Sequence, residues 1–192
     1  GKNLAFSVLY NKKIEEITNL FTLNIIVALS VVESLKTVCN LNFAIKWPND
    51  ILAENKKIAG ILIENTFKNQ NEVQSIIGIG LNVNQSQFEN LPQASSLFLL
   101  ENQLFDRETL LISIVNRLEF NLNQLENLKE DYFWNTYHAI LFKKEVVSTF
   151  ESALGNRFVG KIQKVTKDGK LEVLLEDDSV TFFDVKEVKM LY

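Results

Sequence analysis

The chain carries KWPNDI at residues 46–51 and KIAGILIE at residues 57–64, separated by a short polar turn. The proline in the first string cannot donate to a sheet ladder, so it ends a strand and leaves Asn49 and Asp50 in a turn, which suits short polar side chains. Six residues separate Asp50 from Lys57, a spacing that fits a hairpin returning the two charged side chains to each other. We therefore expect a carboxylate, an amide and an ammonium group at one end of a β-hairpin.

A third string, IGIGLNVN at residues 77–84, combines a strand pattern with two glycines and an asparagine. Glycine lets a ligand approach a strand closely, so Gly60, Gly78 and Gly80 would let a flat ring lie against the sheet. Asn82 offers an amide donor and acceptor to a purine edge. Gly-x-Gly also marks bulges, and without a third glycine opening a helix it is no dinucleotide fingerprint. On spacing alone, a surface hairpin with a solvated lysine and aspartate stays an open alternative.

Outward from these strings, the apolar spacing predicts further strands and helices. Strand patterns cover residues 3–10, 43–47, 51–53, 57–66 and 73–83, helical spacing covers residues 18–38, 107–128 and 132–138, and residues 84–93 form a polar loop. Asp106 is a candidate N-cap of the second helix. Beyond Leu141 the pattern changes to short strands at residues 145–151, 157–166, 171–176, 180–185 and 188–191, with a tight turn at 167–170. This order predicts an α+β architecture with a mixed β-sheet and helices, followed by a small closed barrel.

The charge balance and the rare residue types exclude several kinds of protein. The 20 basic and 24 acidic side chains give a formal charge of −4, which argues against a broad nucleic-acid-binding surface. The single cysteine, Cys39, excludes an internal disulfide framework and a cysteine-rich zinc site, and the single histidine, His138, excludes a histidine-based metal cluster. The longest apolar run, Ile25–Leu29, is far shorter than a membrane span, and no signal peptide is visible. We expect a cytoplasmic protein.

In this order and spacing, the three strings resemble the biotin–protein ligase family. The opening residues 1–4 with Ser7 are similar to the strand that follows the family's glycine- and arginine-rich loop, and the closing strands are similar to its C-terminal domain. The resemblance covers essentially the whole chain. It implies a catalytic domain at residues 1–141 and a small SH3-like β-barrel at residues 142–192. The family's Ser-Thr-Asn segment, biotin-contacting glutamine and glycine–arginine loop would lie upstream, so we expect an N-terminally incomplete catalytic domain that folds but ligates poorly.

The resemblance also implies roles for individual residues. Lys57 matches the lysine that contacts the biotin carboxylate and the adenylate phosphate. Asp50 matches the acid that orients the acceptor lysine and is a candidate to deprotonate it. The other matched positions are for binding: Asn49 beside the reacting carboxylate and phosphate, the backbone of Gly60, Ile61 and Leu62 along the biotin tail, Gly80 against a flat ring, and Asn82 facing adenine. No residue is assigned to a metal.

The implied activity is ATP-dependent activation of biotin as biotinyl-5′-AMP, followed by transfer to a lysine of a biotin carboxyl carrier domain in a biotin-dependent carboxylase. ATP and biotin are the implied ligands, with Mg²⁺ to screen the triphosphate. No membrane or nucleic-acid partner is expected from this segment, and a homodimer stays open. Two alternatives remain: a lipoate- or octanoyl-transferring relative on the same fold, and a non-catalytic, biotinyl-adenylate-sensing part of a biotin repressor.

Overall fold

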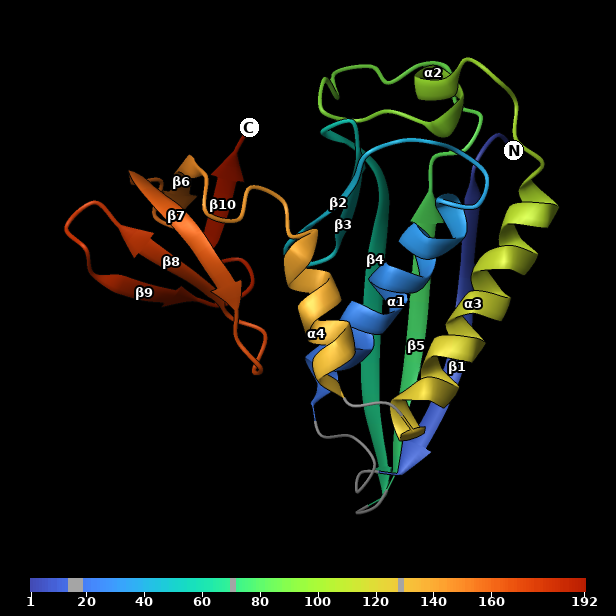
Figure 1. The fold of residues 1–192 in the computed structure, drawn as a ribbon, viewed down its shortest axis with the longest axis horizontal. Coiled ribbons are helices and arrows are strands. Elements are labelled where there is room, and N and C mark those ends of the chain that lie inside the picture. The colour runs from blue at the N-terminus through green and yellow to red at the C-terminus, as the bar shows by residue number, and fades with distance from the viewer. Residues whose placement is uncertain (14–18, 70–71, 128–129) are drawn as a thin grey trace.

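The computed structural model describes residues 1–13, 19–69, 72–127 and 130–192, and it contains a large and a small β-sheet (Figure 1). The large sheet consists of β1 (Leu4–Lys13), β2 (Phe43–Lys46), β3 (Asp50–Ala53), β4 (Lys56–Asn69) and β5 (Glu72–Leu81), in the order β1-β5-β4-β3-β2. Its pairings are all antiparallel, so the prediction of a mixed sheet is wrong. The reason is connection length, because only two or three residues separate each strand from the next between β2 and β5, whereas a parallel pair needs a long crossover.

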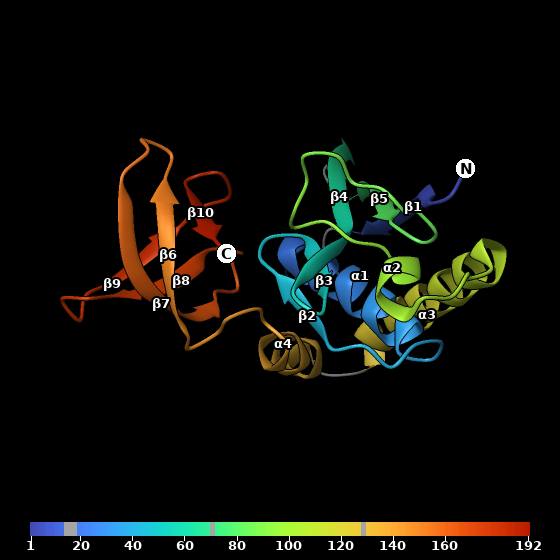
Figure 2. The same cartoon turned by 90° about the horizontal axis from the view of Figure 1, so that it is seen from above.

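Helices cover one face of the large sheet (Figures 1 and 2). They are α1 (Leu20–Leu35), α3 (Arg107–Asn127) and α4 (Glu130–Ala139), while the short α2 (Leu97–Glu101) lies beyond one end of the sheet. Because α1 packs against the sheet, α3 and α4, most of its residues are buried, and its apolar surface is wider than the predicted stripe. Asn19 caps α1, since its Oδ1 accepts from the Phe21 amide at 2.7 Å. The predicted helix ends Thr18 and Leu128 lie outside the described residues.

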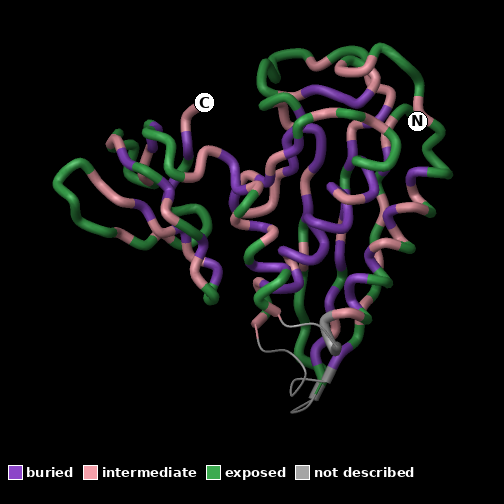
Figure 3. The backbone as a smooth tube through the Cα atoms, in the orientation of Figure 1, coloured by how far each residue is buried: buried purple, intermediate pink, exposed green. Residues whose placement is uncertain are grey.

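The large sheet packs one face against the helices and leaves the other open (Figure 2), and residues of different burial follow one another along its strands (Figure 3). On β5, alternate positions from Ile77 to Leu81 are buried toward the helices, and the positions between them, including Gly80, face away. The register places Gly80 beside Gly60 of β4 on one side and Ala5 of β1 on the other. Small residues on three neighbouring strands therefore leave a strip of nearly bare backbone across the open face.

The small sheet consists of β6 (Val147–Ser152), β7 (Arg157–Val165), β8 (Leu171–Leu175), β9 (Val180–Phe183) and β10 (Val188–Leu191), in the order β10-β6-β7-β8-β9. The predicted tight turn between β7 and β8 is confirmed, with Gly169 at φ +86° and the Thr166 amide donating to the Lys170 carbonyl at 2.9 Å. Within the described chain no pairing joins the edge strands β9 and β10. The sheet is therefore not closed, and the SH3-like barrel is not confirmed.

Side chains also connect the two sheets. Trp47, which follows β2, donates from Nε1 to the Gly169 carbonyl at 2.9 Å. Phe21 of α1 packs against the same turn, and Gln93 donates to the carbonyl of Tyr192, which follows β10. The division into domains at residues 141 and 142 stays a prediction. Within the described ranges, no helix is long and apolar enough to cross a membrane.

Candidate active-site groove

A close ion pair between Lys57 and Asp50 lies on the open face of the large sheet. Lys57 Nζ is 2.5 Å from Asp50 Oδ1, so the two side chains meet as the hairpin spacing predicts. They are nevertheless not cross-strand partners, because the register shifts at a bulge and pairs Asp50 with Gly60 and Lys57 with Leu52. The Lys57 side chain therefore reaches diagonally from β4 to Asp50 on β3. Gly60 lies directly beside the ion pair, since a Cβ there would be in van der Waals contact with it, 3.6 Å from Lys57 Nζ and 3.8 Å from Asp50 Oδ1.

Lys46 brings a second ammonium group to the same carboxylate. It pairs directly with Asp50 across β2 and β3, and its Nζ is 3.9 Å from Asp50 Oδ2. Burial lowers the pKa of Lys46, and the nearby Lys57 lowers it further, while Asp50 raises it. Lys46 belongs to the KWPNDI string, yet it was not among the predicted site residues. Its i,i+4 spacing from Asp50 is the signal that could have identified it as a partner across a tight hairpin.

Two cavities meet at Lys57 and form one groove. The first has a volume of about 590 Å³ and is lined by β1, β4 and β5 together with Asn49 and Asp50. The second has a volume of about 750 Å³ and is lined by the same strands, Asn82, the loop at residues 85–94 and Tyr192. Four residues line both cavities, namely Ala5, Lys57, Gly60 and Gly80. The groove is therefore continuous over the strip of small residues, with a positive charge at its midpoint.

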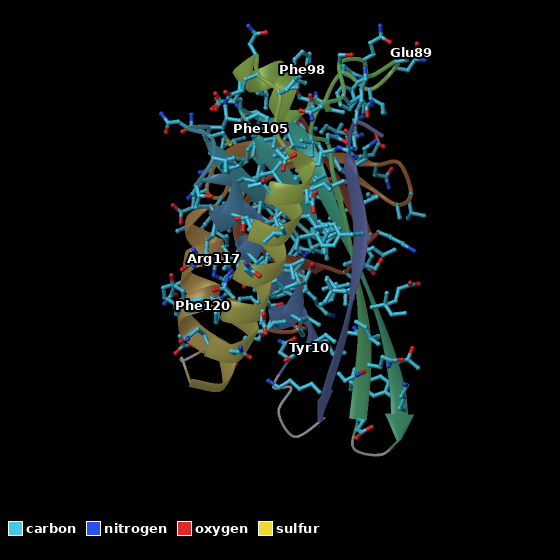
Figure 4. The ribbon with its side chains drawn as sticks, turned by 90° about the vertical axis from the view of Figure 1, so that its right-hand side faces the viewer. Tyr10, Glu89, Phe98, Phe105, Arg117 and Phe120 are labelled. Atoms are coloured by element: carbon cyan, nitrogen blue, oxygen red, sulfur yellow. The ribbon has the colours of Figure 1, made fainter. Side chains whose placement is uncertain are left out.

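The loop at residues 85–94 covers the second cavity. It is fixed to the start of β4, where the Lys57 amide donates to the Gln93 carbonyl at 2.7 Å and the Ser95 amide donates to the Lys57 carbonyl at 2.9 Å. In Figure 4 this loop, marked by Glu89, lies at one end of the large sheet, while Arg117 and Phe120 lie along α3 on the helical side. Sequence analysis predicted a polar loop here but not its contribution of Phe88 and other apolar residues to the groove.

Asn49 is held by hydrogen bonds to β4. Its Nδ2 donates to the Ile61 carbonyl at 2.7 Å, and the Ile61 amide donates to the Asn49 carbonyl at 3.0 Å. Ile61 is only 2% exposed, so its side chain is buried on the helical side of the sheet, and the predicted contact of its backbone with biotin stays a prediction. Leu62 points the other way, and its side chain is 62% exposed on the open face. Leu62 is therefore an apolar wall of the first cavity, in addition to the backbone contact predicted for it.

Asn82 lies just past the end of β5 and lines the second cavity. Its backbone amide donates to the Ile58 carbonyl at 2.8 Å, and its Nδ2 donates to the Ser95 carbonyl at 3.0 Å. The Asn82 side-chain amide therefore already donates one hydrogen bond within the protein, which was not predicted from the sequence. The Oδ1 atom supplies the acceptor that an exocyclic amino group of a purine requires.

The described residues do not fit a protein-held magnesium site. No group of three or more His, Cys, Asp or Glu side chains comes together among them. The groove carboxylate, Asp50, already faces two lysine ammonium groups. Magnesium prefers several oxygen ligands, so an ion here would have to be held by the phosphates of a nucleotide.

Comparison with known proteins points to one family. Residues 1–82, which contain the first two strings, the third string up to Asn82 and most of the groove, match the model of the "Biotin/lipoate A/B protein ligase family". The fold matches the apo structure of biotin protein ligase from Aquifex aeolicus with a TM-score of 0.81 and 26% sequence identity, over 99% of this chain and 82% of that one. The family model, the curated relatives and the shared fold together support the biotin/lipoate A/B protein ligase family for this chain.

Relatives within the biotin/lipoate A/B protein ligase family are longer than this chain. The bifunctional ligase/repressor BirA of Bacillus spizizenii is 28% identical over 176 residues, which are 88% of this chain and 50% of that protein. The biotin–[acetyl-CoA-carboxylase] ligase of Mycobacterium tuberculosis is 37% identical over 83 residues, which are 43% of this chain and 29% of that protein. The chain thus spans about half the length of the first of these relatives.

Proposed function

We propose that the chain is an ATP-dependent ligase that forms biotinyl-5′-AMP and transfers the biotinyl group to a lysine of a biotin carboxyl carrier domain. The observation that supports this most is the continuous groove with Lys57 at the junction of its two cavities. A structure of the Aquifex aeolicus ligase in complex with biotin and ATP has the same fold, with a TM-score of 0.81. We assign the first cavity to biotin and the second to the adenosine group.

The first step joins the two ligands where the cavities meet. A carboxylate oxygen of biotin attacks the α-phosphorus of ATP, the new O–P bond forms, and the bond to the departing pyrophosphate breaks. Negative charge is redistributed over the carboxylate and the phosphate during this step. The Lys57 ammonium stabilises that charge, and its pairing with Asp50 at 2.5 Å positions it in advance.

The second step releases AMP. The neutral ε-amine of the acceptor lysine attacks the biotinyl carbonyl carbon, the C–N bond forms, and the C–O bond to the phosphate breaks with its electron pair leaving on AMP. Free lysine has a pKa of about 10.4, so the amine needs help to lose its proton near neutral pH. The Asp50 carboxylate lies on the open face beside Lys57 and is the group that orients the amine and accepts the proton.

The test is biotin-dependent release of pyrophosphate from ATP, combined with labelling of a carrier domain, for the wild-type chain and for Lys57→Met. We expect biotin to support both reactions, at the low rate expected of an N-terminally incomplete catalytic domain, and lipoate and octanoate to fail in both. Lys57→Met should lower pyrophosphate release by about 10²-fold, the usual scale for losing a group that stabilises transition-state charge. The matched control is Lys68→Met, because Lys68 is an exposed lysine of the same strand.

The assignment fails if Lys57→Met reacts at the wild-type rate. If lipoate or octanoate replaces biotin in the wild-type chain, the protein is a transferase for those acids instead. Tight binding of biotinyl-adenylate without any pyrophosphate release from biotin and ATP would favour the adenylate-sensing alternative.

A further inference from the structure

Lys46 is an unusually buried lysine at the edge of the groove. Its side chain is only 16% exposed, although lysine is rarely buried without a partner. On β2 it follows the fully buried Ile45, so the strand alternation turns it away from the helical core. Burial lowers the pKa of Lys46, because keeping the ammonium group charged away from water costs free energy. A lysine retained in such a place needs a physical reason beyond solubility.

The geometry around Asp50 provides that reason. Lys57 Nζ contacts Oδ1 at 2.5 Å, and Lys46 Nζ lies 3.9 Å from Oδ2, so each carboxylate oxygen faces a different ammonium group. Two cations on separate oxygens define the plane of a carboxylate, whereas one cation leaves it free to rotate. The distance of 3.9 Å is too long for a hydrogen bond. Oδ2 can therefore still accept a hydrogen bond from an incoming amine.

The small sheet holds Lys46 from the other side. Its Nζ lies 5.3 Å from the centre of the Tyr192 ring, a distance at which the aromatic face attracts a cation. The ring is fixed by an edge contact with Phe142, at 5.1 Å between ring centres, and the Tyr192 carbonyl accepts from Gln93. Burial and the charge of Asp50 raise the pKa of Tyr192, which keeps its hydroxyl neutral.

We propose that Lys46 is a positioning residue for the transfer step: with Lys57 it fixes the Asp50 carboxylate, and the ring of Tyr192 holds the Lys46 ammonium in place. The proposal rests on the function proposed above, because it assigns Asp50 to the acceptor amine. It makes the end of β10 a structural support of the reacting carboxylate. The other charged group that acts on Lys46 is Lys189 of β10, which is exposed.

A different role is possible for a lysine beside a site that receives a protein, namely attraction of an acidic acceptor surface. The two roles predict different kinetics. A docking charge changes the concentration of acceptor needed for half-maximal rate, whereas a positioning residue changes the rate at saturating acceptor.

The experiment measures single-turnover transfer from preformed biotinyl-adenylate to a carrier domain at several carrier concentrations. We expect Lys46→Met to lower the rate at saturating carrier by about 10-fold or more, with the half-saturating concentration little changed. Lys46→Arg should recover most of the rate because it keeps the charge. Tyr192→Leu should lose several-fold in rate, and Tyr192→Phe, which keeps the ring, should lose less than Tyr192→Leu. Lys189→Met is the matched control and should keep the wild-type rate.

A wild-type rate in Lys46→Met, or a change confined to the half-saturating concentration, would overturn the proposal. A second readout does not depend on ligation. In a thermal double-mutant cycle of Lys46→Met and Asp50→Asn, we expect the combined loss in Tm to differ from the sum of the single losses by about 2–4 °C. Additive losses would also overturn the proposal, while a wild-type chain that fails to transfer but shows this coupling would place the error in the proposed function.

Discussion

At the scale of single residues, the Asp50 carboxylate faces two ammonium groups, with Lys57 Nζ 2.5 Å from Oδ1 and Lys46 Nζ 3.9 Å from Oδ2. The types of Asp50 and Lys57 and their hairpin spacing predicted that a carboxylate and an ammonium group would meet, and they lie 2.5 Å apart. The bulge that makes their contact diagonal has no marker in the sequence, because it depends on how β3 and β4 pair along their length. Lys46 was not predicted as a site residue for a similar reason, since the Tyr192 ring that its ammonium group faces is distant in sequence.

Asp50 should matter more for transfer than for activation. Asp50→Asn keeps the shape of the side chain but removes the proton acceptor, so transfer from preformed biotinyl-adenylate should fall by about 10²-fold. Adenylate formation should fall less, because Lys57 still carries its charge. Single-turnover measurements of each step provide the check. Equal losses in both steps would mean that Asp50 acts mainly by positioning Lys57.

Tyr137 of α4 is a residue whose hydroxyl contributes little to stability. The side chain is buried, and its hydroxyl has no hydrogen-bond partner within the described residues. Removing an unsatisfied buried hydroxyl removes a desolvation cost of about 1–3 kcal/mol. Tyr137→Phe should therefore leave the free energy of unfolding unchanged or raise it by about 1 kcal/mol, as measured by chemical denaturation.

The control for this change is another buried hydroxyl. Thr22 Oγ1 donates to Glu130 at 2.7 Å and accepts from the Trp134 indole at 3.2 Å. Thr22→Val should lower the free energy of unfolding by about 1 kcal/mol, because it removes both hydrogen bonds of this hydroxyl, while the Trp134 indole keeps its bond to Glu130 at 3.0 Å. If Tyr137→Phe destabilises as much as Thr22→Val, the Tyr137 hydroxyl has a partner in solution.

At the scale of helices and strands, periodicity predicted which elements form but not how they pair. The strands and the three longer helices were all recognised, and the Asp106 cap is confirmed, since its Oδ1 accepts from the Thr109 amide at 2.7 Å. Two features were not predictable in this way: whether the large sheet is mixed, and whether the small sheet closes. Both depend on pairing between strands that are far apart in sequence. The apolar stripe of α1 predicted one buried side only. In the structure α3 and α4 pack against α1 as well as the sheet, so most of its residues are buried.

Gly169 lies where the turn between β7 and β8 packs against Phe21 of α1, so a side chain at this position should destabilise the protein. A Cβ at this position would lie 2.6 Å from Phe21 Cδ2, and its φ of +86° disfavours any side chain. Gly155 has a similar φ of +83° but nothing within 4 Å of a Cβ. Gly155→Ala should cost about 1–2 kcal/mol of unfolding free energy from backbone strain, and Gly169→Ala about 1–3 kcal/mol more from the clash. Similar losses in the two variants would show that Phe21 yields easily to the added methyl group.

At the scale of the whole molecule, the groove arises from an asymmetry of the large sheet. Helices occupy one face, and the open face has glycine or alanine on three adjacent strands, at Gly60, Gly80 and Ala5. The sequence predicted the glycines as a ligand surface, but only the register showed that they align into one strip. The second cavity also needs residues 85–94 and Tyr192, which come from separate parts of the chain.

The strip can be blocked without disturbing the fold. At Gly80 the nearest atom to an added Cβ is the Gly60 carbonyl oxygen at 4.0 Å, so a larger side chain fits there and projects into the groove. Ile76 lies on the same face of β5 and is 44% exposed, and it lines neither cavity. Gly80→Val should therefore keep the wild-type Tm but bind the ligand more weakly. Ile76→Val should keep both the wild-type Tm and the wild-type affinity for the ligand.

The most direct measurement is calorimetric titration of the chain with a hydrolysis-resistant biotinyl-adenylate analogue that carries a sulfamoyl group in place of the phosphate. The groove predicts one binding site per chain, with affinity lowered by about 10-fold or more, or 1.4 kcal/mol, in Gly80→Val and unchanged in Ile76→Val. Equal affinity in the wild-type chain and a folded Gly80→Val variant would contradict the account, because the ligand would then bind away from the strip between Gly60 and Gly80.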